Sequence, residues 1–363
     1  MMNQTERVEM RGCLGQVTCE NNIIRLKGWV ASINQGAVEG FKLFFGNQEI
    51  TDFKVEKQLS SLDVAQLFPT LDCAENARFY IYVDLNTIEE KYKKDCLIRL
   101  IPIFNGKPGD TLFNLLESSL PVPEKEDRVG VGGSFKFVAC DFLGHFVNKA
   151  NLQPNETVLD AGSGVGRIAY SLTYYLDETA RYEGFDIVKK WIDWSQDNIH
   201  SRYPQFNFKW VNLYSQHYNP EGNLKAENFI FPYDNEQFTF VFLTSVFTHI
   251  YAAAAHNYLQ QIARVLQPGG RCLCTFFLLN EETQQLTESG KSKLNFIYQA
   301  NDSYYAEPDD PENAIAHPEA TVMQWLKELN LTVVGKYYGM WCGRNQGHSY
   351  QDILVLQKEV VQP

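Results

Sequence analysis

Three glycines alternate through the segment VLDAGSGVGRI, which spans residues 158–168. An apolar run ends at Asp160, and Gly162, Gly164 and Gly166 then occupy every second position. Glycines let the backbone take positive φ and let a ligand approach it closely, and a following helix leaves backbone N–H groups free at its start. The spacing therefore predicts a strand, a ligand-binding turn and a helix, with candidate ligand contacts at Asp160, Gly162, Ser163, Gly164, Gly166 and Arg167.

The glycine spacing also narrows the class of ligand. A dinucleotide fingerprint reads G-x-G-x-x-G, but the residue three positions after Gly164 is Arg167. This disfavours an NAD-dependent oxidoreductase. An acidic residue ahead of G-x-G-x-G suits a cationic, amine-bearing nucleoside without a pyrophosphate, so we expect S-adenosylmethionine as the cofactor.

Polar residues also end the next apolar segments along the chain. Asp186 closes the second one, where a carboxylate can accept hydrogen bonds from both ribose hydroxyls. The third, residues 206–213, ends at Asn212, whose amide suits the edge of adenine, and the fourth is residues 238–245. Open parallel sheets bind ligands at the carboxyl ends of their strands, so the further candidate cofactor contacts are Asp186, Ile187, Asn212, Leu213, Thr244 and Ser245.

From about Gly132 to the C-terminus, the chain resembles the class I S-adenosylmethionine-dependent methyltransferases. The resemblance lies in VLDAGSGVGRIAYSL, YEGFDIVKKWIDW, HYNPEG, FPYDNEQFTFVFLTSVFTHI, ARVLQPGGRCLCTFF and WCGR…SYQDILVLQK. It is similar to a bacterial subgroup of small-molecule or sugar methyltransferases. The resemblance implies a Rossmann-like seven-stranded sheet with the last strand antiparallel, and cofactor contacts at Asp160, Gly162, Gly164 and Asp186. The subgroup has Asp where this chain has Asn212, which keeps an acceptor oxygen but drops a charge.

His249 is the candidate catalytic residue. It lies in the segment 244–250, which follows the fourth strand, and its imidazole titrates near neutral pH. A base at this position takes the proton from an attacking hydroxyl, whereas alignment supplies most of the remaining rate enhancement. The alternative interpretation is that His249 caps or packs under the following helix.

The acceptor should be a small molecule, because aromatic and paired polar side chains near the C-terminal hairpin suit sugar recognition. The same residue types also suit a hairpin that packs on the sheet. We predict an O-methyltransferase acting on a sugar or another hydroxylated small molecule. N-methylation of a small metabolite and a non-catalytic binding protein stay open as alternatives. Candidate acceptor contacts are Tyr214, Tyr305, His317, Trp341, Arg344 and Gln351.

Composition excludes several classes of partner. The chain has 363 residues and a formal net charge of −12, which disfavours nucleic acid and anionic membranes. The eight cysteines form no C-x-x-C pair, so we expect no metal site and reduced thiols. The segment MMNQTERVEMRG has no apolar core typical of a signal peptide, and no apolar stretch approaches 18 residues, so we expect a cytoplasmic protein. A homo-oligomer stays open.

The chain divides into two predicted domains of different pattern. Residues 1–117 contain short alternating segments typical of an antiparallel β-sandwich, and they loosely resemble accessory β-domains of bacterial carbohydrate-modifying enzymes. Residues 118–129 are proline-bearing and charged, which predicts a linker. Residues 130–363 alternate strands and helices, which predicts an α/β methyltransferase domain with an acceptor-side insertion at 278–317. The glycines at 130, 132 and 133 precede a predicted helix over 135–147, a candidate lid.

Overall fold

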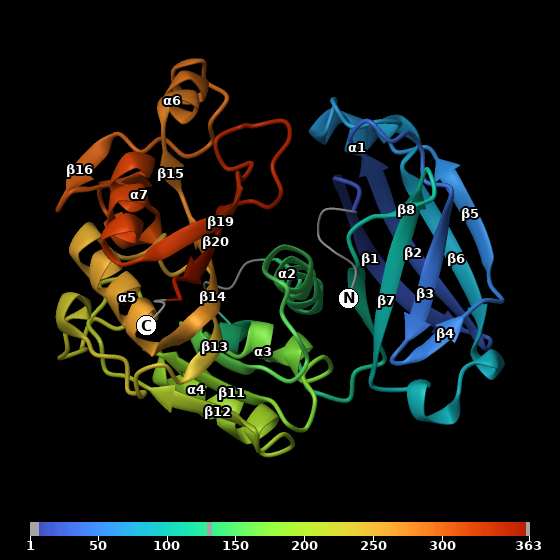
Figure 1. Ribbon diagram of the computed structural model, residues 1–363, viewed down its shortest axis with the longest axis horizontal. Helices are drawn as coiled ribbons and strands as arrows, with labels where there is room; N and C mark the ends of the chain where they lie inside the picture. Colours follow the sequence, from blue (N-terminus) through green and yellow to red (C-terminus); the bar gives the residue numbers. More distant parts are fainter. Residues whose placement is uncertain (1–6, 129–132, 361–363) are drawn as a thin grey trace. The chain divides into compact units, whose positions relative to one another are not determined.

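The computed structural model describes residues 7–128 and 133–360, and its chain forms two compact units (Figure 1). Unit 1 comprises Met1–Asn151 and Arg167–Tyr175, and unit 2 comprises Leu152–Gly166 and Leu176–Pro363. Of the predicted linker, residues 118–128 are described, whereas residue 129 and the glycines at 130 and 132 lie outside the described residues. The separation into domains at residues 118–129 and the lid role therefore stay predictions.

Unit 1 contains the two predicted antiparallel sheets. One has the order β1-β2-β6-β5 and the other β4-β3-β7-β8, with β9 also paired to β7. Alternating side chains from both sheets, including Leu26, Phe79 and Ile98, are fully buried in one hydrophobic core. The elements are β1 (Met10–Glu20), β2 (Ile23–Ser32), β3 (Gly40–Phe45), β4 (Gln48–Ile50), β5 (Lys54–Leu59), α1 (Leu62–Leu67), β6 (Arg78–Asp84), β7 (Cys96–Phe104), β8 (Lys107–Pro108) and β9 (Leu112–Leu116).

Two helices, α2 (Phe135–Ala150) and α3 (Arg167–Leu172), also belong to unit 1. The Asn148 side chain of α2 donates to the carbonyl of Thr111 and accepts from its N–H, both at 2.9 Å. The Ser171 hydroxyl of α3 donates to the carbonyl of Ala139 at 2.8 Å. The predicted helix over 135–147 is thus present, and hydrogen bonds join it to the segment before β9 and to α3.

Unit 2 contains a seven-stranded sheet with the order β12-β11-β10-β13-β14-β20-β19. Strand β20 pairs antiparallel with both of its neighbours, whereas β12, β11, β10, β13 and β14 are mutually parallel. This confirms the predicted sheet with an antiparallel last strand. The strands are β10 (Thr157–Ala161), β11 (Arg181–Asp186), β12 (Phe206–Trp210), β13 (Phe238–Leu243), β14 (Leu266–Phe276), β19 (Leu331–Tyr337) and β20 (Asp352–Lys358).

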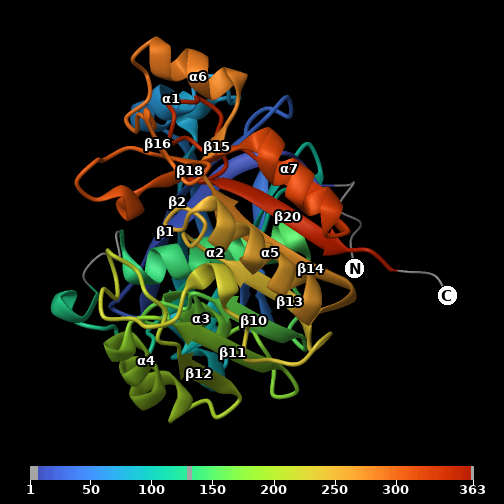
Figure 2. The ribbon, with the colours of Figure 1, turned by 90° about the vertical axis from the view of Figure 1, so that its left-hand side faces the viewer.

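The strand order reverses between β10 and β13, which is where ligands bind in open α/β sheets. Helices α5 (Ala252–Val265) and α7 (Glu319–Glu328) lie beside the sheet (Figure 2), and their buried side chains share one apolar core with its strands. Helix α4 (Lys189–Ser195) continues into a π turn at Gln196–His200. A buried apolar core therefore supports the strands at this reversal.

The predicted insertion folds into a small sheet of its own, with the order β15-β18-β17-β16. Its first strand pairs in parallel with its last, so Leu278 lies opposite His317. Its elements are β15 (Leu278–Leu279), α6 (Glu281–Glu288), β16 (Tyr298–Ala300), β17 (Ser303–Tyr305) and β18 (Ile315–Pro318).

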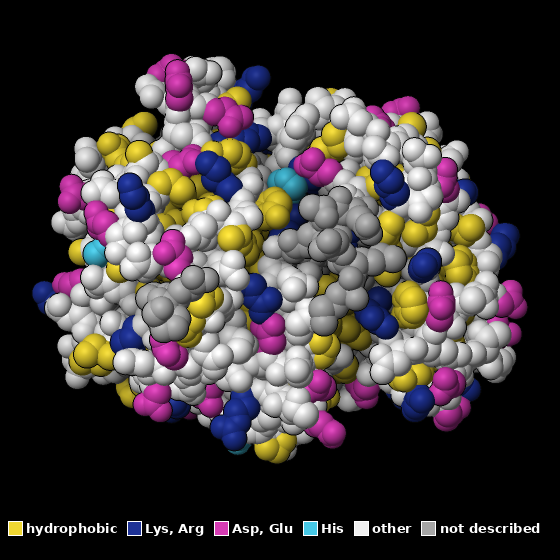
Figure 3. Space-filling model, viewed as in Figure 1, with side chains coloured by type: hydrophobic (Ala, Val, Ile, Leu, Met, Phe, Trp, Pro, Cys, Tyr) yellow, Lys and Arg dark blue, Asp and Glu magenta, His cyan; other side chains and the backbone are white. Residues whose placement is uncertain are grey.

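Within residues 7–128 and 133–360, no helix is long and apolar enough to cross a membrane. On the face drawn in Figure 3, acidic and basic side chains are interspersed.

Candidate functional site

The predicted glycine turn has the expected backbone. Gly162, Gly164 and Gly166 have φ values of 101°, 54° and 71°, in the region that favours glycine. A Cβ at Gly162 would overlap the Val246 side chain, and one at Gly166 would lie 2.6 Å from Cδ1 of Ile199. A Cβ at Gly164 would meet no atom within 4 Å. The outer two glycines are thus required by packing, whereas the space beside Gly164 is open to a ligand.

Asp186 joins this turn to the end of β11. Its carboxylate is buried and accepts from the N–H of Gly164 at 2.7 Å and from the N–H of Val188 at 2.9 Å. Burial raises the pKa of Asp186 to about 6, against the lowering effect of these backbone hydrogen bonds. Each carboxylate oxygen can accept more than one hydrogen bond. The side chain therefore retains the capacity to accept from ribose hydroxyls.

Two buried polar atoms beside the turn lack partners among the described residues. Asp160 accepts from the Tyr182 hydroxyl through Oδ2 at 2.7 Å, but its Oδ1 is unpaired, as is Oγ of Ser163. Burial raises the pKa of Asp160 to about 8. A nearby cation would favour the charged carboxylate. These residues fit a ligand that brings positive charge and N–H donors, as S-adenosylmethionine does.

The other predicted cofactor contacts lie at the ends of the neighbouring strands. The Ile187 carbonyl accepts from Nε1 of Trp210 at 3.0 Å, and Leu213 is buried. The Asn212 side chain exchanges hydrogen bonds with Asn223 and Asn219, each at 3.2 Å. Thr244 follows β13 and is half-buried, and Arg167 is the first residue of α3.

The end of β13 is held by polar side chains from other strands. The backbone of Ser245 has a φ of 58°, and its N–H donates to the Thr275 hydroxyl at 2.8 Å. Its hydroxyl donates to Gln351 at 3.1 Å, and the Gln351 amide donates to Thr248 at 3.4 Å. The structure thus brings the predicted residue Gln351 to the same strand end as Ser245.

His249 is held in one tautomer by the insertion. Its Nδ1 lies 2.7 Å from the carbonyl oxygen of Glu312. Because a carbonyl can only accept, Nδ1 must carry the proton, and in the neutral ring Nε2 keeps its lone pair. Burial lowers the pKa of His249, which favours the neutral ring. The imidazole is therefore arranged as a proton acceptor.

Sequence reasoning missed the groups that surround His249. The His217 ring lies 6.4 Å from the His249 ring, with 19° between their planes, and Nδ1 of His217 lies 2.7 Å from Oδ2 of Asp310. The Tyr218 ring lies 5.4 Å from that of His249, edge to face. HYNPEG and the acidic run DDPEN were visible in the sequence as segments. Nothing in either segment indicated that they meet.

Three further predicted acceptor contacts are Tyr214, Tyr305 and His317. His317 is fully buried, and its Nε2 lies 3.0 Å from the Phe247 carbonyl oxygen. Burial lowers the pKa of His317 to about 4. Tyr214 is exposed, and Tyr305 stacks on Tyr298 with 5.4 Å between ring centres. Their roles toward an acceptor stay predictions.

Trp341 and Arg344 both donate to the buried carboxylate of Asp352. The Trp341 indole donates to Oδ2 at 2.8 Å and the Arg344 guanidinium to Oδ1 at 3.2 Å. The N–H groups of Gly339 and Leu278 donate to the same carboxylate at 2.7 and 2.8 Å. These side chains therefore already have partners within unit 2.

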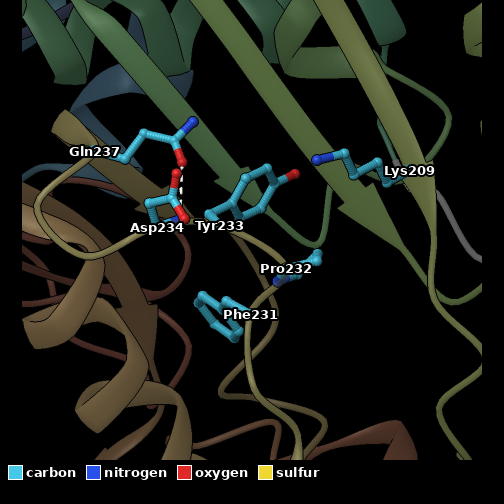
Figure 4. Close-up of a pocket in the computed structure, with 6 residues that line it drawn as sticks. All are labelled: Lys209, Phe231, Pro232, Tyr233, Asp234 and Gln237. Carbon is cyan, nitrogen blue, oxygen red and sulfur yellow. Dashed lines mark hydrogen bonds between the residues drawn. The ribbon is translucent and has the colours of Figure 1, made fainter.

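A separate open hollow, with a volume of about 500 Å³, lies on unit 2 (Figure 4). Lys209 reaches over the Tyr233 ring, with its Nζ 4.3 Å from the ring centre. The residues that line the hollow are Lys209, Phe231, Pro232, Tyr233, Asp234 and Gln237. None of them is a predicted site residue.

Comparison with known proteins finds one family match and several similar solved structures. Residues 159–274, which include most of the turn and all of the 244–250 segment, match the family model of the methyltransferase domain.

The chain is 14% identical to the PH0226 protein from Pyrococcus horikoshii OT3. The match covers 65% of this chain and 96% of that one, with a TM-score of 0.45. It is 15% identical to a SAM-dependent methyltransferase from Aquifex aeolicus, covering 57% and 84%, with a TM-score of 0.36. It is 19% identical to a SAM-dependent methyltransferase from Methanosarcina mazei, covering 58% and 95%, with a TM-score of 0.39. Residues 159–274 are thus similar to a methyltransferase domain, and this match implies S-adenosylmethionine as the cofactor.

Proposed function

We propose that the protein methylates a hydroxyl group of a sugar or another hydroxylated small molecule, with His249 as the general base. The observation that carries this proposal is the hydrogen-bonding distance of 2.7 Å between Nδ1 of His249 and the carbonyl oxygen of Glu312. It leaves Nε2 as the basic nitrogen of a ring whose pKa is lowered by burial. A hydroxyl acceptor needs such a base, because its proton must leave as the new O–C bond forms.

The donor side of the proposed site consists of the glycine turn and the two buried carboxylates. Asp186 would accept from the ribose, and Asp160 with Ser163 would face the cationic end of the ligand. Asn212 is the candidate for the edge of adenine. When bound, S-adenosylmethionine supplies a methyl group on a sulfonium, which is already activated for transfer. The protein then has to align the acceptor and remove its proton.

The two alternatives predict different behaviour of His249. An amine acceptor reacts through a free lone pair when neutral, so N-methylation would depend much less on a base at this position. A binding protein without catalytic activity would bind the cofactor and transfer no methyl group. Turnover on a hydroxyl acceptor, together with its dependence on His249, separates the three functions.

The test is a mass-spectrometric screen of hydroxylated small molecules and amines with S-adenosylmethionine. On a hydroxyl acceptor, His249→Ala should lower kcat by roughly 100-fold or more and leave cofactor affinity unchanged. His256→Ala is the matched control, because this histidine lies on α5 and pairs at 3.9 Å with Glu328. Unchanged turnover in His249→Ala, or methylation of amines alone, would contradict the proposal.

A further inference from the structure

We propose that His217 and His249 together bind two neighbouring hydroxyl groups of the acceptor, so that the preferred acceptor is a vicinal diol. This inference rests on the proposed function and narrows its class of substrate. The two imidazoles come from different segments, one after β12 and one after β13. Their ring centres lie 6.4 Å apart and their planes are 19° from parallel.

Each imidazole ring is held in place through its own Nδ1 atom. Nδ1 of His249 lies 2.7 Å from the Glu312 carbonyl oxygen, and Nδ1 of His217 lies 2.7 Å from a carboxylate oxygen of Asp310. A carbonyl or a carboxylate behind Nδ1 fixes the tautomer in which the neutral ring presents a lone pair at Nε2. Each ring can therefore accept a hydrogen bond from one hydroxyl.

The insertion also fixes the loop that carries His217. A carboxylate oxygen of Glu312 accepts from the Ser215 hydroxyl at 2.6 Å and from the N–H of His217 at 3.3 Å. The Ser215 hydroxyl in turn accepts from the N–H of Tyr218 at 3.1 Å. Glu312 thus holds His249 through its backbone and the His217 loop through its side chain. Glu312 and Asp310 therefore together fix the two imidazoles relative to each other.

The spacing suits neighbouring oxygens on one molecule. An oxygen that donates to Nε2 lies about 4 Å from the ring centre, so two rings with centres 6.4 Å apart can each accept from one of two oxygens about 3 Å apart. A single hydroxyl has one proton and can donate to only one ring, which leaves the other ring to water. A vicinal pair of hydroxyls can donate to both rings. The 278–317 insertion, through Asp310 and Glu312, thereby selects the acceptor.

An aromatic wall completes this part of the site. The Tyr218 ring lies edge to face against His217 at 4.4 Å and against His249 at 5.4 Å, and Trp191 lies 5.9 Å from Tyr218. Trp191 is buried, and its indole N–H has no partner among the described residues. Aromatic rings beside hydrogen-bonding groups are suited to the alternating apolar and hydroxyl-bearing surfaces of a sugar.

The proposed step is balanced without a further reactant. One acceptor hydroxyl loses its proton to Nε2 of His249 while its oxygen forms a bond to the methyl carbon. The C–S bond breaks, and its electron pair stays on sulfur as the sulfonium becomes a neutral thioether. The neighbouring hydroxyl keeps its proton and donates to Nε2 of His217. His217 is thus a substrate-binding residue, and His249 is the residue that takes the proton.

The test compares matched acceptors with matched variants. The probes are methyl glycosides of common hexoses, each paired with the monodeoxy derivative that lacks one neighbouring hydroxyl. For the wild type, kcat/KM should be at least 10-fold higher for the diol. His217→Gln should lose about 10-fold on the diol, mainly through KM, and little on the deoxy sugar. His249→Gln should instead lower kcat on both, and His256→Gln should change neither.

A second readout does not depend on turnover. Calorimetry in the presence of S-adenosylhomocysteine should show weaker binding of the diol to His217→Gln and to Asp310→Asn. Equal rates of the wild type on diol and deoxy sugar would overturn this inference and leave the proposed function standing. Equal losses on both acceptors in His217→Gln would also overturn it. Methylation of amines but of no hydroxyl compound would overturn both. If His217→Gln fails to fold, the comparison of acceptors with the wild type decides alone.

Discussion

The proposed donor and acceptor sides of the site are built in different ways. The donor side is backbone geometry: a glycine turn that follows one buried strand, tied to the next strand by the Gly164–Asp186 hydrogen bond. The acceptor side is made of side chains from two loops, held by Asp310 and Glu312 of an insertion. A turn packed into the sheet tolerates little change, whereas an insertion with its own small sheet can vary. Substitutions on the two sides should therefore have separable effects.

Gly162→Val should give the largest effect. A branched side chain at a φ of 101° is strained, and its Cβ would overlap Val246. We expect a loss of about 2–5 kcal/mol in the free energy of unfolding. Gly164→Ala is the comparison, because its Cβ would meet no protein atom. It should cost only about 1 kcal/mol of stability while weakening cofactor binding. Denaturant unfolding and cofactor titration measure the two effects, and equal stability losses would show that the open space beside Gly164 has no special role.

Asp186→Ala should weaken cofactor binding by roughly 1–3 kcal/mol, because the ribose hydroxyls lose their acceptor. Acceptor binding should change little, since His217 and His249 keep their own partners. Glu183→Ala is a control from the same strand, with its side chain near Lys209 instead of the turn. Isothermal titration of both variants with S-adenosylmethionine measures the difference. Wild-type affinity in Asp186→Ala would remove this residue from the donor site.

The pH dependence of cofactor affinity should follow Asp160. Its pKa of about 8 leaves the carboxyl protonated at neutral pH, and a bound cation would favour the charged form. Binding should therefore release a proton, and affinity should rise with pH up to about 8 and then level off. Asp160→Asn should abolish this dependence. A profile that is flat between pH 6 and about 8 in the wild type would contradict the placement of the cation beside Asp160.

The smallest effect should be the pH dependence of turnover near neutrality. Only the neutral His249 ring accepts a proton, so the rate should rise with pH and then reach a plateau. Because burial lowers its pKa below the usual value of 6.5, the plateau should begin in the mildly acidic range. Rates measured under single-turnover conditions, with cofactor saturating at each pH, isolate this step. A rate still rising steeply above pH 7 would assign the base to another group.

Prediction from the sequence worked where the relevant residues are neighbours in the chain. The turn, its positive φ values and the strand that precedes it are specified by local spacing, because glycine is needed where the backbone is unusual. The seven-stranded sheet with its antiparallel last strand was expected from the family resemblance, and the structure confirms it. Its place shortly after the fourth strand was sufficient to identify His249 as a candidate catalytic residue.

The partners of His249 could not be predicted in this way. His217 and Asp310 are 93 positions apart, and the insertion between β15 and β18 has no periodicity that fixes its packing. For Trp341 and Arg344, the residue type alone did not identify the hydrogen-bond partner. Indole and guanidinium donors suit a sugar, but here they satisfy the buried carboxylate of Asp352. A donor's type does not reveal which acceptor is within its reach.

The pairing of Leu278 with His317 has a consequence for the evolution of the acceptor side. The two ends of the insertion lie on adjacent paired strands, so the segment begins and ends at nearly one point. The entropy of closing a loop grows only slowly with its length. Exchange of this segment for a longer or shorter one would then cost the sheet little. A graft between residues 279 and 315 could give the same donor half a new set of acceptors without redesign of its cofactor site.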